Sequence, residues 1–162
     1  MNDKLSSFES IVRLAGQLGS PRPESLQTNA ELQSHPFDER NIHSKISSVS
    51  KKLFDDGHFA QSTFEAFKFL DNEVKRVSGL EDTGFKLMMA AFSEERPPIK
   101  LTKLSTESEK DEQKGYRHIF AGAMSSIRNP RGHENLVDPI DLCLDHLSFA
   151  SFLLRRLENT FP

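Results

Sequence analysis

Leu53-Phe54-Asp55-Asp56-Gly57-His58-Phe59 is a polar break between two stretches of helical periodicity, and it decides the fold class of this chain. Glycine after paired aspartates favours a left-handed stop, so we expect a turn at residues 55–58. Apolar residues recur at helical spacing on both sides: Ile42, Ile46, Val49, Leu53 and Phe54 before the turn, and Phe59, Phe64, Phe67, Leu70, Val74 and Val77 after it. The pattern predicts helices over residues 38–55 and 59–77, packed as an antiparallel hairpin.

Further helices are expected toward the C-terminus. Ser78-Gly79 ends the second helix of the hairpin, and the apolar segment 85–92 predicts one or two helical turns. Residues 93–110 are expected to form a long loop that a brief extended pairing at Ile99, Leu101 and Leu104 could pin. A fourth major helix should begin at Asp111 or Glu112, and a last one after Asp138-Pro139, with Asp138 as its cap. Because strand signals are nearly absent, we predict an all-α bundle of four to five main helices.

The N-terminus carries a separate amphipathic pattern. Its apolar residues are Phe8, Ile11, Val12, Ala15 and Leu18, and Ser6 or Ser7 could cap the helix that they predict. Gly19-Ser20-Pro21-Arg22-Pro23 ends this helix, and a polar linker continues to about Pro36. We therefore expect residues 1–36 to form an accessory helix and linker, with a docked packing helix as its plainest role. Residues 37–162 form the main helical domain in this prediction.

Composition limits the classes of function. The 162 residues fit one domain, and the net charge of −3 argues against a generally basic nucleic-acid coat but allows a local basic site. Cys143 is the one cysteine, so an internal disulfide and a cysteine-based metal site are excluded. The sequence shows no apolar signal core and no run of the about 20 apolar residues that a membrane span needs. We expect a cytoplasmic protein.

One short segment concentrates chemistry, Ser125-Ser126-Ile127-Arg128-Asn129-Pro130-Arg131-Gly132-His133-Glu134. Proline disfavours helix at the residue before it, so the helix is expected to end at Asn129, and Gly132 should let the backbone turn before His133. Cleavage of RNA by its own 2′-hydroxyl needs a base, an acid and a cation on the phosphate. Histidine suits both proton transfers and arginine clamps phosphate, without a metal ion or cofactor.

The spacing of Arg128 and His133 is not specific by itself. In the plainer alternative, Arg128 pairs with a nearby carboxylate, and His133 caps the last helix or its neighbour. A single histidine also cannot comfortably act as base and acid at once. A symmetric dimer that places two such segments face to face would supply two imidazoles and two guanidiniums.

The preceding helix has one side suited to a close approach. Tyr116, Phe120, Ala123 and Ile127 are expected in the core, whereas Ala121, Gly122 and Ser125 are small residues expected on the opposite, polar side. Arg117 and His118 flank them. A second protomer or a substrate strand could lie there.

These residues resemble a known family. Arg128-Asn129-Pro130-Arg131-Gly132-His133 is similar to the motif of the HEPN superfamily (higher eukaryote and prokaryote nucleotide-binding domains), an arginine followed by a histidine after four to six residues. Three further blocks resemble the Ymh-type branch of uncharacterised bacterial HEPN proteins: residues 53–59 with Glu65-Ala66-Phe67-Lys68, residues 84–92, and residues 115–123. The likeness covers about residues 36–157.

The resemblance implies a HEPN-like bundle, a homodimer formed through the motif face, and metal-independent endoribonuclease activity. Related proteins often act as toxins or as effectors of anti-phage defence, so an antitoxin or another defence-system protein is an expected partner. By resemblance, Arg128 binds the scissile phosphate of an RNA substrate, His133 is the acid–base residue, and Asn129 orients the histidine or contacts RNA. Gly132 departs mildly from the residues usual beside the histidine.

Further residues are candidates with plainer alternatives. Auxiliary RNA-binding candidates are Arg131, His118, Arg117 and Ser125, and Glu65 is a possible acidic partner of the motif, although a solvated or salt-bridged surface position is its plainer role. Glu134 could pair with Arg131. His58 suits a turn or cap, and His146 a hydrogen-bonded core or interface position. Glycine-rich phosphate loops and clustered metal ligands are absent, which makes kinase, NTPase and metallohydrolase functions weak hypotheses.

Two alternatives to a nuclease stay open. One is a non-catalytic HEPN module that binds RNA, a nucleotide or a partner protein. The other is a structural helical subunit of a larger, defence-related complex.

Overall fold

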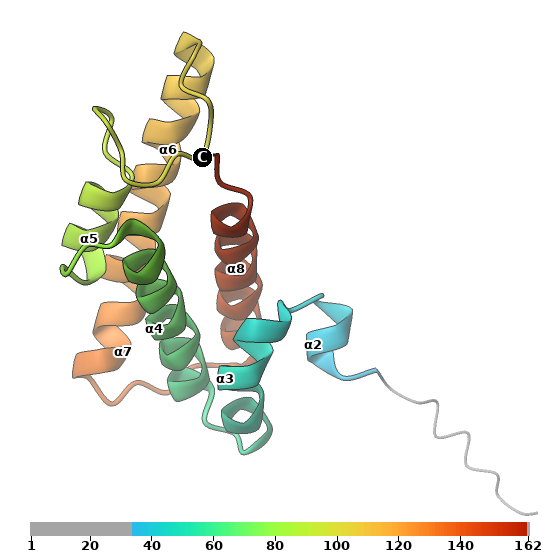
Figure 1. The fold of residues 1–162 in the computed structure, drawn as a ribbon. Helices are drawn as coiled ribbons and strands as arrows, with labels where there is room; N and C mark the ends of the chain where they lie inside the picture. The colour runs from blue at the N-terminus through green and yellow to red at the C-terminus, as the bar shows by residue number, and fades with distance from the viewer. Residues whose placement is uncertain (1–33, 162) are drawn as a thin grey trace, which may run out of the picture. The chain divides into compact units, whose positions relative to one another are not determined.

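Helices account for the regular structure of the computed structural model, which describes residues 34–161 (Figure 1). The elements are α2 (Pro36–Glu39), α3 (Ser44–Asp55), α4 (Phe59–Ser78), α5 (Gly84–Ala91), α6 (Glu107–Ala123), the π-helix η1 (Met124–Arg128), α7 (Asn129–His133) and α8 (Ile140–Glu158). In this part of the chain, extended pairing is limited to one isolated antiparallel bridge, between Lys100 and Phe161. The all-α prediction is confirmed. The predicted N-terminal helix falls outside the described residues.

The helical hairpin forms as predicted between α3 and α4. Gly57 has a φ of +81°, the left-handed conformation that lets the chain reverse between the two helices. The start of the first helix differs from the expected residue 38. Asn41 has a φ of +49° and separates the single turn of α2 from α3, and the side chain of His43 then caps α3 by accepting a hydrogen bond from the amide of Lys45.

Helix α4 lies at the centre of the bundle. In Figure 1 it runs between α8 on one side and α5 and α7 on the other, and it packs against these three helices, against η1 and against α3. Its buried stripe includes Phe67, Leu70 and Val74. The helix ends where predicted, at Gly79 in the left-handed conformation with a φ of +69°.

A buried carboxylate joins α4 to the start of α5. Asp71 is 3% exposed and accepts hydrogen bonds from the hydroxyl of Thr83, at 2.8 Å, and from the amide of Gly84, at 2.7 Å. These bonds compensate the carboxylate for its loss of water. Gly84 takes a φ of +62°, which a residue with a side chain adopts at a cost. The first residue of α5 is therefore held firmly against α4.

Helix α6 begins earlier than the predicted Asp111 or Glu112. Thr106 and Glu109 form a capping box, so the helix starts at Glu107. The loop before it is pinned at two of the three expected residues, since Ile99 and Leu101 are buried and Lys100 between them pairs with Phe161. Leu104 is only partly buried and lies outside this pairing.

The helix does not end at Asn129. The chain passes from α6 through η1 directly into α7, and the amide of Asn129 donates to the carbonyl of Met124, five residues back. A proline in a regular α-helix clashes with the carbonyl four residues before it. We attribute the tolerance of Pro130 to the wider π turn that precedes it, a feature frequent at functional sites. Residues 128–133 therefore follow a helical path.

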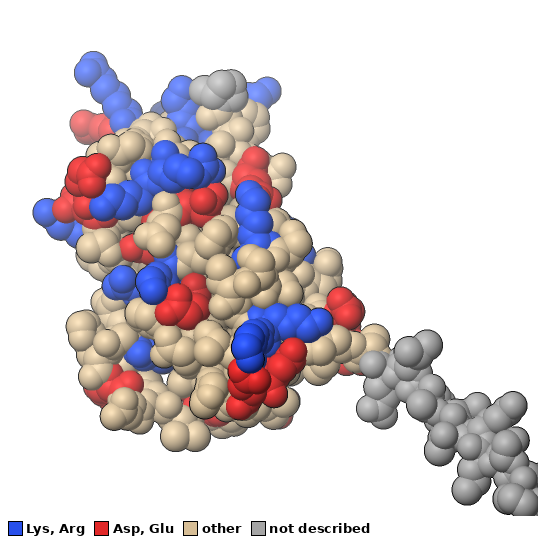
Figure 2. Space-filling view, turned by 60° about the horizontal axis from the view of Figure 1, so that its bottom comes forward, with Lys and Arg blue, Asp and Glu red and all other residues tan. Residues whose placement is uncertain are grey.

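Charges of both signs are mixed on the surface. Figure 2 shows Lys and Arg side chains next to Asp and Glu side chains over the face in view, in keeping with the net charge of −3. Among the described helices, none has the length and apolar character needed to cross a membrane.

Candidate functional site

The guanidinium of Arg128 lies where η1 meets α4 and α5. Its Cζ atom is 5.8 Å from the centre of the Phe64 ring, a cation–π contact, and its Nη1 donates to Oδ1 of Asn129 at 3.2 Å. Its Nε is buried without a hydrogen-bond partner. Within residues 34–161, Arg128 forms no ion pair with a carboxylate, contrary to the plainer alternative for this residue. Its positive charge is therefore not neutralised locally.

Two glycines let the backbone approach this arginine and its aromatic neighbour. A β-carbon at Gly132 would lie 2.9 Å from Cε2 of Phe64, closer than real side chains allow. Gly132 thus lets α7 pack closely on the Phe64 ring of α4, and the predicted turn at this residue is wrong, because Gly132 lies within α7. A β-carbon at Gly84 would lie 3.8 Å from Nη1 of Arg128 and 3.9 Å from Oδ1 of Asn129, so the start of α5 forms another wall of the site.

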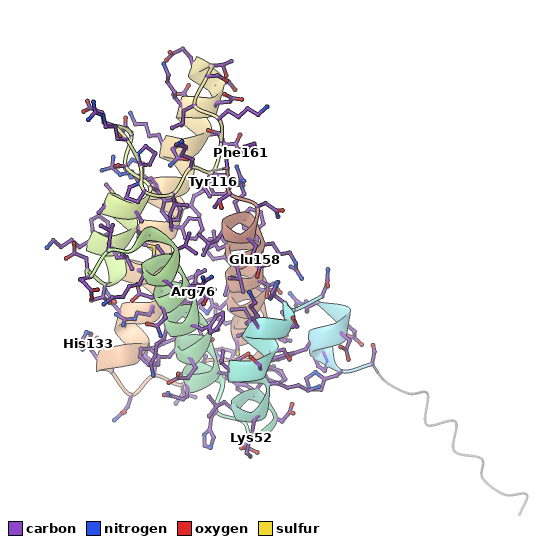
Figure 3. All side chains as sticks on the ribbon, viewed as in Figure 1. Lys52, Arg76, Tyr116, His133, Glu158 and Phe161 are labelled. Atoms are coloured by element: carbon purple, nitrogen blue, oxygen red, sulfur yellow. The ribbon has the colours of Figure 1, made fainter. Side chains whose placement is uncertain are left out.

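His133 is exposed at the end of α7. It does not cap the last helix, because α8 begins at Ile140 and its N-cap residue is Pro139, with no side-chain capping bond. Figure 3 places its side chain at the outer edge of the bundle. Arg128 contacts the Phe64 ring on α4, whereas the imidazole is accessible to solvent. The two groups share a helical segment, but no hydrogen bond joins them.

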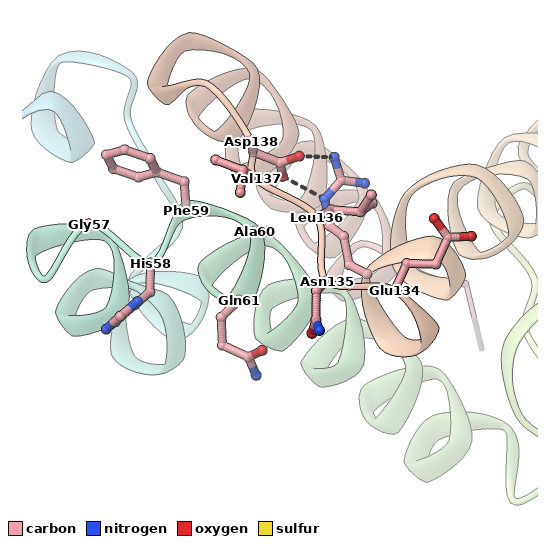
Figure 4. A pocket seen from close by; sticks show the side chains of 11 residues that line it. Gly57, His58, Phe59, Ala60, Gln61, Glu134, Asn135, Leu136, Val137 and Asp138 are labelled. Atoms are coloured by element: carbon pink, nitrogen blue, oxygen red, sulfur yellow. Dashed lines mark hydrogen bonds and ion pairs between the residues drawn. The ribbon is translucent and has the colours of Figure 1, made fainter.

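Arg131 belongs to a buried ion pair. Its Nε and Nη2 bind the two oxygens of Asp138 at 2.6 and 2.8 Å, and its Nη1 donates to the carbonyl of Ile127 at 2.9 Å (Figure 4). The two side chains are only 6% and 5% exposed. The predicted partner Glu134 and the predicted cap at Asp138 are both wrong, because the loop after α7 brings Asp138 onto Arg131. The pair ties α7 to the residues that precede α8.

Of the other candidate residues, Arg117 and Glu65 are bound to protein groups, whereas His118 and Ser125 face solvent. Arg117 donates to the carbonyl of Met89 at 3.0 Å and pairs with Glu94 at 2.9 Å, so it holds the end of α5. His118 and Ser125 are exposed. Glu65 accepts hydrogen bonds from Gln61 and Lys68 on its own helix, as its plainer interpretation expects.

The expected stripe of small residues is interrupted. Ala121 is 1% exposed, because α5 packs against α6 on the side where Arg117, one turn earlier, reaches Met89. Gly122 and Ser125 are exposed as predicted, and Ser126 is exposed with them. The core prediction for Phe120, Ala123 and Ile127 is confirmed.

A hollow of about 400 Å³ lies beside α7 and the loop that follows it (Figure 4). It is bounded by the start of α4 on one side and by the loop between α7 and α8 on the other, and the Arg131–Asp138 pair forms part of its wall. His58 lines it and occupies the turn before α4 as predicted, although its side chain makes no capping bond. Val137 is 95% exposed at its rim.

His146 on α8 is partly buried and lies near Arg131. Burial lowers its pKa from the usual value, and the positive charge of Arg131 lowers it further. Its Nδ1 is buried without a hydrogen-bond partner, so the predicted hydrogen-bonded core position is wrong in that respect. Residues 34–161 also contain no group of three or more His, Cys, Asp or Glu placed to hold a metal ion.

Phe64 and Gly84 are the site residues that sequence reasoning missed. The prediction counted Phe64 in the apolar set of its helix, yet Phe64 lies one position after the buried Thr63, off the stripe of Phe67, Leu70 and Val74, and it remains partly exposed. That offset is a usable signal. Nothing in the sequence indicates that Gly84 meets Arg128, since Asp71 sets its position through a tertiary contact.

Comparison with known proteins gives a family without an assigned activity. A family model described as "Protein of unknown function (Hypoth_ymh)" matches residues 40–157. No curated protein matches the chain, and no solved structure does. The matched range extends from the residues before α3 through nearly all of α8.

Proposed function

The chain belongs to the Hypoth_ymh family, and from the surroundings of Arg128 we propose that it is an endoribonuclease of the HEPN type that cleaves RNA without a metal ion. The observation that carries this proposal is the guanidinium of Arg128. It rests on the Phe64 ring, has no carboxylate partner in the described chain, and is followed on the same helical segment by the exposed His133. A cation that is positioned but not neutralised suits a phosphate ligand.

The reaction uses the 2′-hydroxyl of the RNA as nucleophile. This oxygen attacks the neighbouring phosphorus as a base removes its proton, and the 5′-oxygen of the next nucleotide leaves with a proton from an acid. The products carry a 2′,3′-cyclic phosphate and a free 5′-hydroxyl. Arg128 stabilises the negative charge that grows on the phosphorane, and the imidazole of His133 transfers protons.

Asn129 orients the guanidinium in this scheme. Its Oδ1 accepts from Nη1 of Arg128, which leaves the amide NH₂ group of Asn129 free to donate to a phosphate or a ribose oxygen. This role adds to the two expected from the resemblance, orientation of the histidine and contact with RNA.

A homodimer completes the proposed site. Each copy contributes one His133, and the exposed Gly122, Ser125 and Ser126 leave room for a second copy beside the motif. His118 and Ser125, both exposed, then lie on the face that RNA or the other protomer meets. We place the protein in the cytoplasm as a toxin or an anti-phage defence effector, restrained by an antitoxin or another defence-system partner.

A non-catalytic module that binds RNA is the second candidate. It is favoured by the separation of the two proposed catalytic groups, because no hydrogen bond joins the exposed His133 to Arg128. Product analysis separates the two functions.

The test is cleavage of RNA by the full-length protein in buffer that contains EDTA. We expect products with 2′,3′-cyclic phosphate ends, and we expect Arg128→Ala and His133→Ala to abolish them. Arg76→Ala serves as the control, since Arg76 is exposed and pairs with Glu73 on the far half of α4. Absence of cleavage, together with wild-type behaviour of both motif variants in cells, would overturn the nuclease proposal.

A further inference from the structure

The ring of Phe64 carries a second cation besides Arg128. The Nζ atom of Lys68 lies 5.7 Å from the ring centre, and Cζ of Arg128 lies 5.8 Å from it. Phe64 and Lys68 are one turn apart on α4, so their side chains share a face of that helix. Two positive groups from different elements, α4 and η1, therefore meet at one aromatic side chain.

Lys68 is available to a ligand. Its side chain is 48% exposed, and the partner that it has is Glu65, three residues earlier, at 3.2 and 3.3 Å. Such exposed pairs within a helix contribute little to stability, so the ammonium group can reorient at small cost. This separates Lys68 from Arg131, whose guanidinium is 6% exposed and bound through two bonds.

We propose that Lys68 is a second phosphate-binding residue of the RNA site, an inference that rests on the proposed function. Arg128 holds the scissile phosphate, and Lys68 holds a neighbouring phosphate of the same strand. Both cations lie at a known distance from the centre of the Phe64 ring. The distance between Nζ of Lys68 and Cζ of Arg128 therefore cannot exceed the sum of these two distances. A strand that passes over this edge of α4 presents one phosphate per nucleotide to the pair.

The protein contains a closely matched lysine for comparison. Lys110 on α6 pairs with Glu107, also three residues earlier, and its side chain is 55% exposed. Among residues 34–161, Lys110 makes no cation–π contact with an aromatic ring, whereas Lys68 lies over Phe64. Changing Lys110 removes the same charge and the same kind of ion pair at a position away from Arg128.

The test measures RNA binding against salt. The full-length His133→Ala protein, which cannot complete the cleavage, is titrated into a labelled single-stranded RNA oligonucleotide at salt concentrations from about 50 to about 200 mM. Each phosphate contact to a single strand contributes about −0.7 to the slope of log K against log salt. We expect Lys68→Gln to weaken binding at the lowest salt and to reduce the slope by about 0.7. Between about 50 and about 200 mM salt, the loss of RNA affinity in the Lys68→Gln protein is then about two- to threefold smaller than in the parent.

The controls separate two kinds of failure. Lys110→Gln should leave affinity and slope as in the parent, and Lys68→Arg should restore the slope. If Lys68→Gln matches Lys110→Gln while Arg128→Ala still weakens binding, the role of Lys68 is overturned and the RNA site at Arg128 stands. If the parent binds no RNA, or Arg128→Ala binds as the parent does, the proposed function and this inference fail together.

Discussion

Gly132 of α7 lies so close to Phe64 of α4 that a β-carbon on the glycine would be 2.9 Å from Cε2 of the ring. The same ring lies 5.8 Å from Cζ of Arg128. A single aromatic side chain therefore sets both the approach of α7 and the position of the arginine.

Gly132→Ala should destabilise the protein and weaken the site. The added methyl group must displace Phe64 or α7, and overpacking of this kind costs about 1–3 kcal/mol of unfolding free energy. Urea unfolding measures this loss. Gly115→Ala on α6 is the control: its β-carbon would meet nothing within 4 Å, so it should stabilise the helix by about 0.5–1 kcal/mol. If Gly132→Ala stabilised the protein as much as Gly115→Ala does, the close packing of α7 on Phe64 would be contradicted.

Phe64→Leu should lower cleavage of RNA by more than its effect on stability explains. The leucine keeps an apolar side chain but lacks the ring face, so Arg128 loses a cation–π contact of about 0.5–2 kcal/mol. This corresponds to a two- to thirtyfold reduction of kcat/KM, by the relation of about 1.4 kcal/mol per factor of ten. Phe64→Tyr retains the ring and should retain activity. The measurement is kcat and KM at a temperature where both variants are folded; loss of activity in the tyrosine variant would count against the cation–π role.

Asp138→Asn should be strongly destabilising. It leaves the guanidinium of Arg131 buried without its counter-ion, and breaking a buried pair in this way costs about 3–5 kcal/mol. The double variant Arg131→Met with Asp138→Leu removes both charges and should recover much of that stability. Urea unfolding of Arg131→Met, of Asp138→Leu and of the double variant gives the coupling energy. Additive losses would show that the pair does not act as a unit.

Acidification should destabilise the protein through His146. Burial lowers its folded-state pKa below the usual value of 6.5, so below that pH the unfolded chain binds more protons than the folded one. Its effect on stability is therefore absent at pH 7.5 and grows as the pH falls from 6.5 toward the lower folded-state pKa. We expect His146→Gln to lose less unfolding free energy than wild type between pH 7.5 and pH 5.5. An identical pH dependence of the two proteins would exclude His146 as the source.

Local backbone preferences determined much of the fold in advance. The turn at Gly57 and the helix end at Gly79 depend on the backbone freedom of glycine. The buried stripe of α4 depends on the helical spacing of its apolar residues. Both signals can be read from residues close together in the sequence. The same local reasoning was wrong at Pro130. The rule that proline disfavours helix at the residue before it predicts an end at Asn129. It does not anticipate that a π turn continues the helix and packs against α4.

The sequence by itself therefore determined the helices, the α3–α4 hairpin and the presence of Arg128, Asn129 and His133 in one segment. Only the tertiary structure decided which groups surround that segment. Phe64 contacts Gly132, and Asp138 forms an ion pair with Arg131. Gly84 lies close to Arg128, and all three contacts result from packing between separate elements. Helical periodicity reports which face of an element is apolar, but the partner of a buried charge and the space left for a β-carbon depend on how the helices pack together.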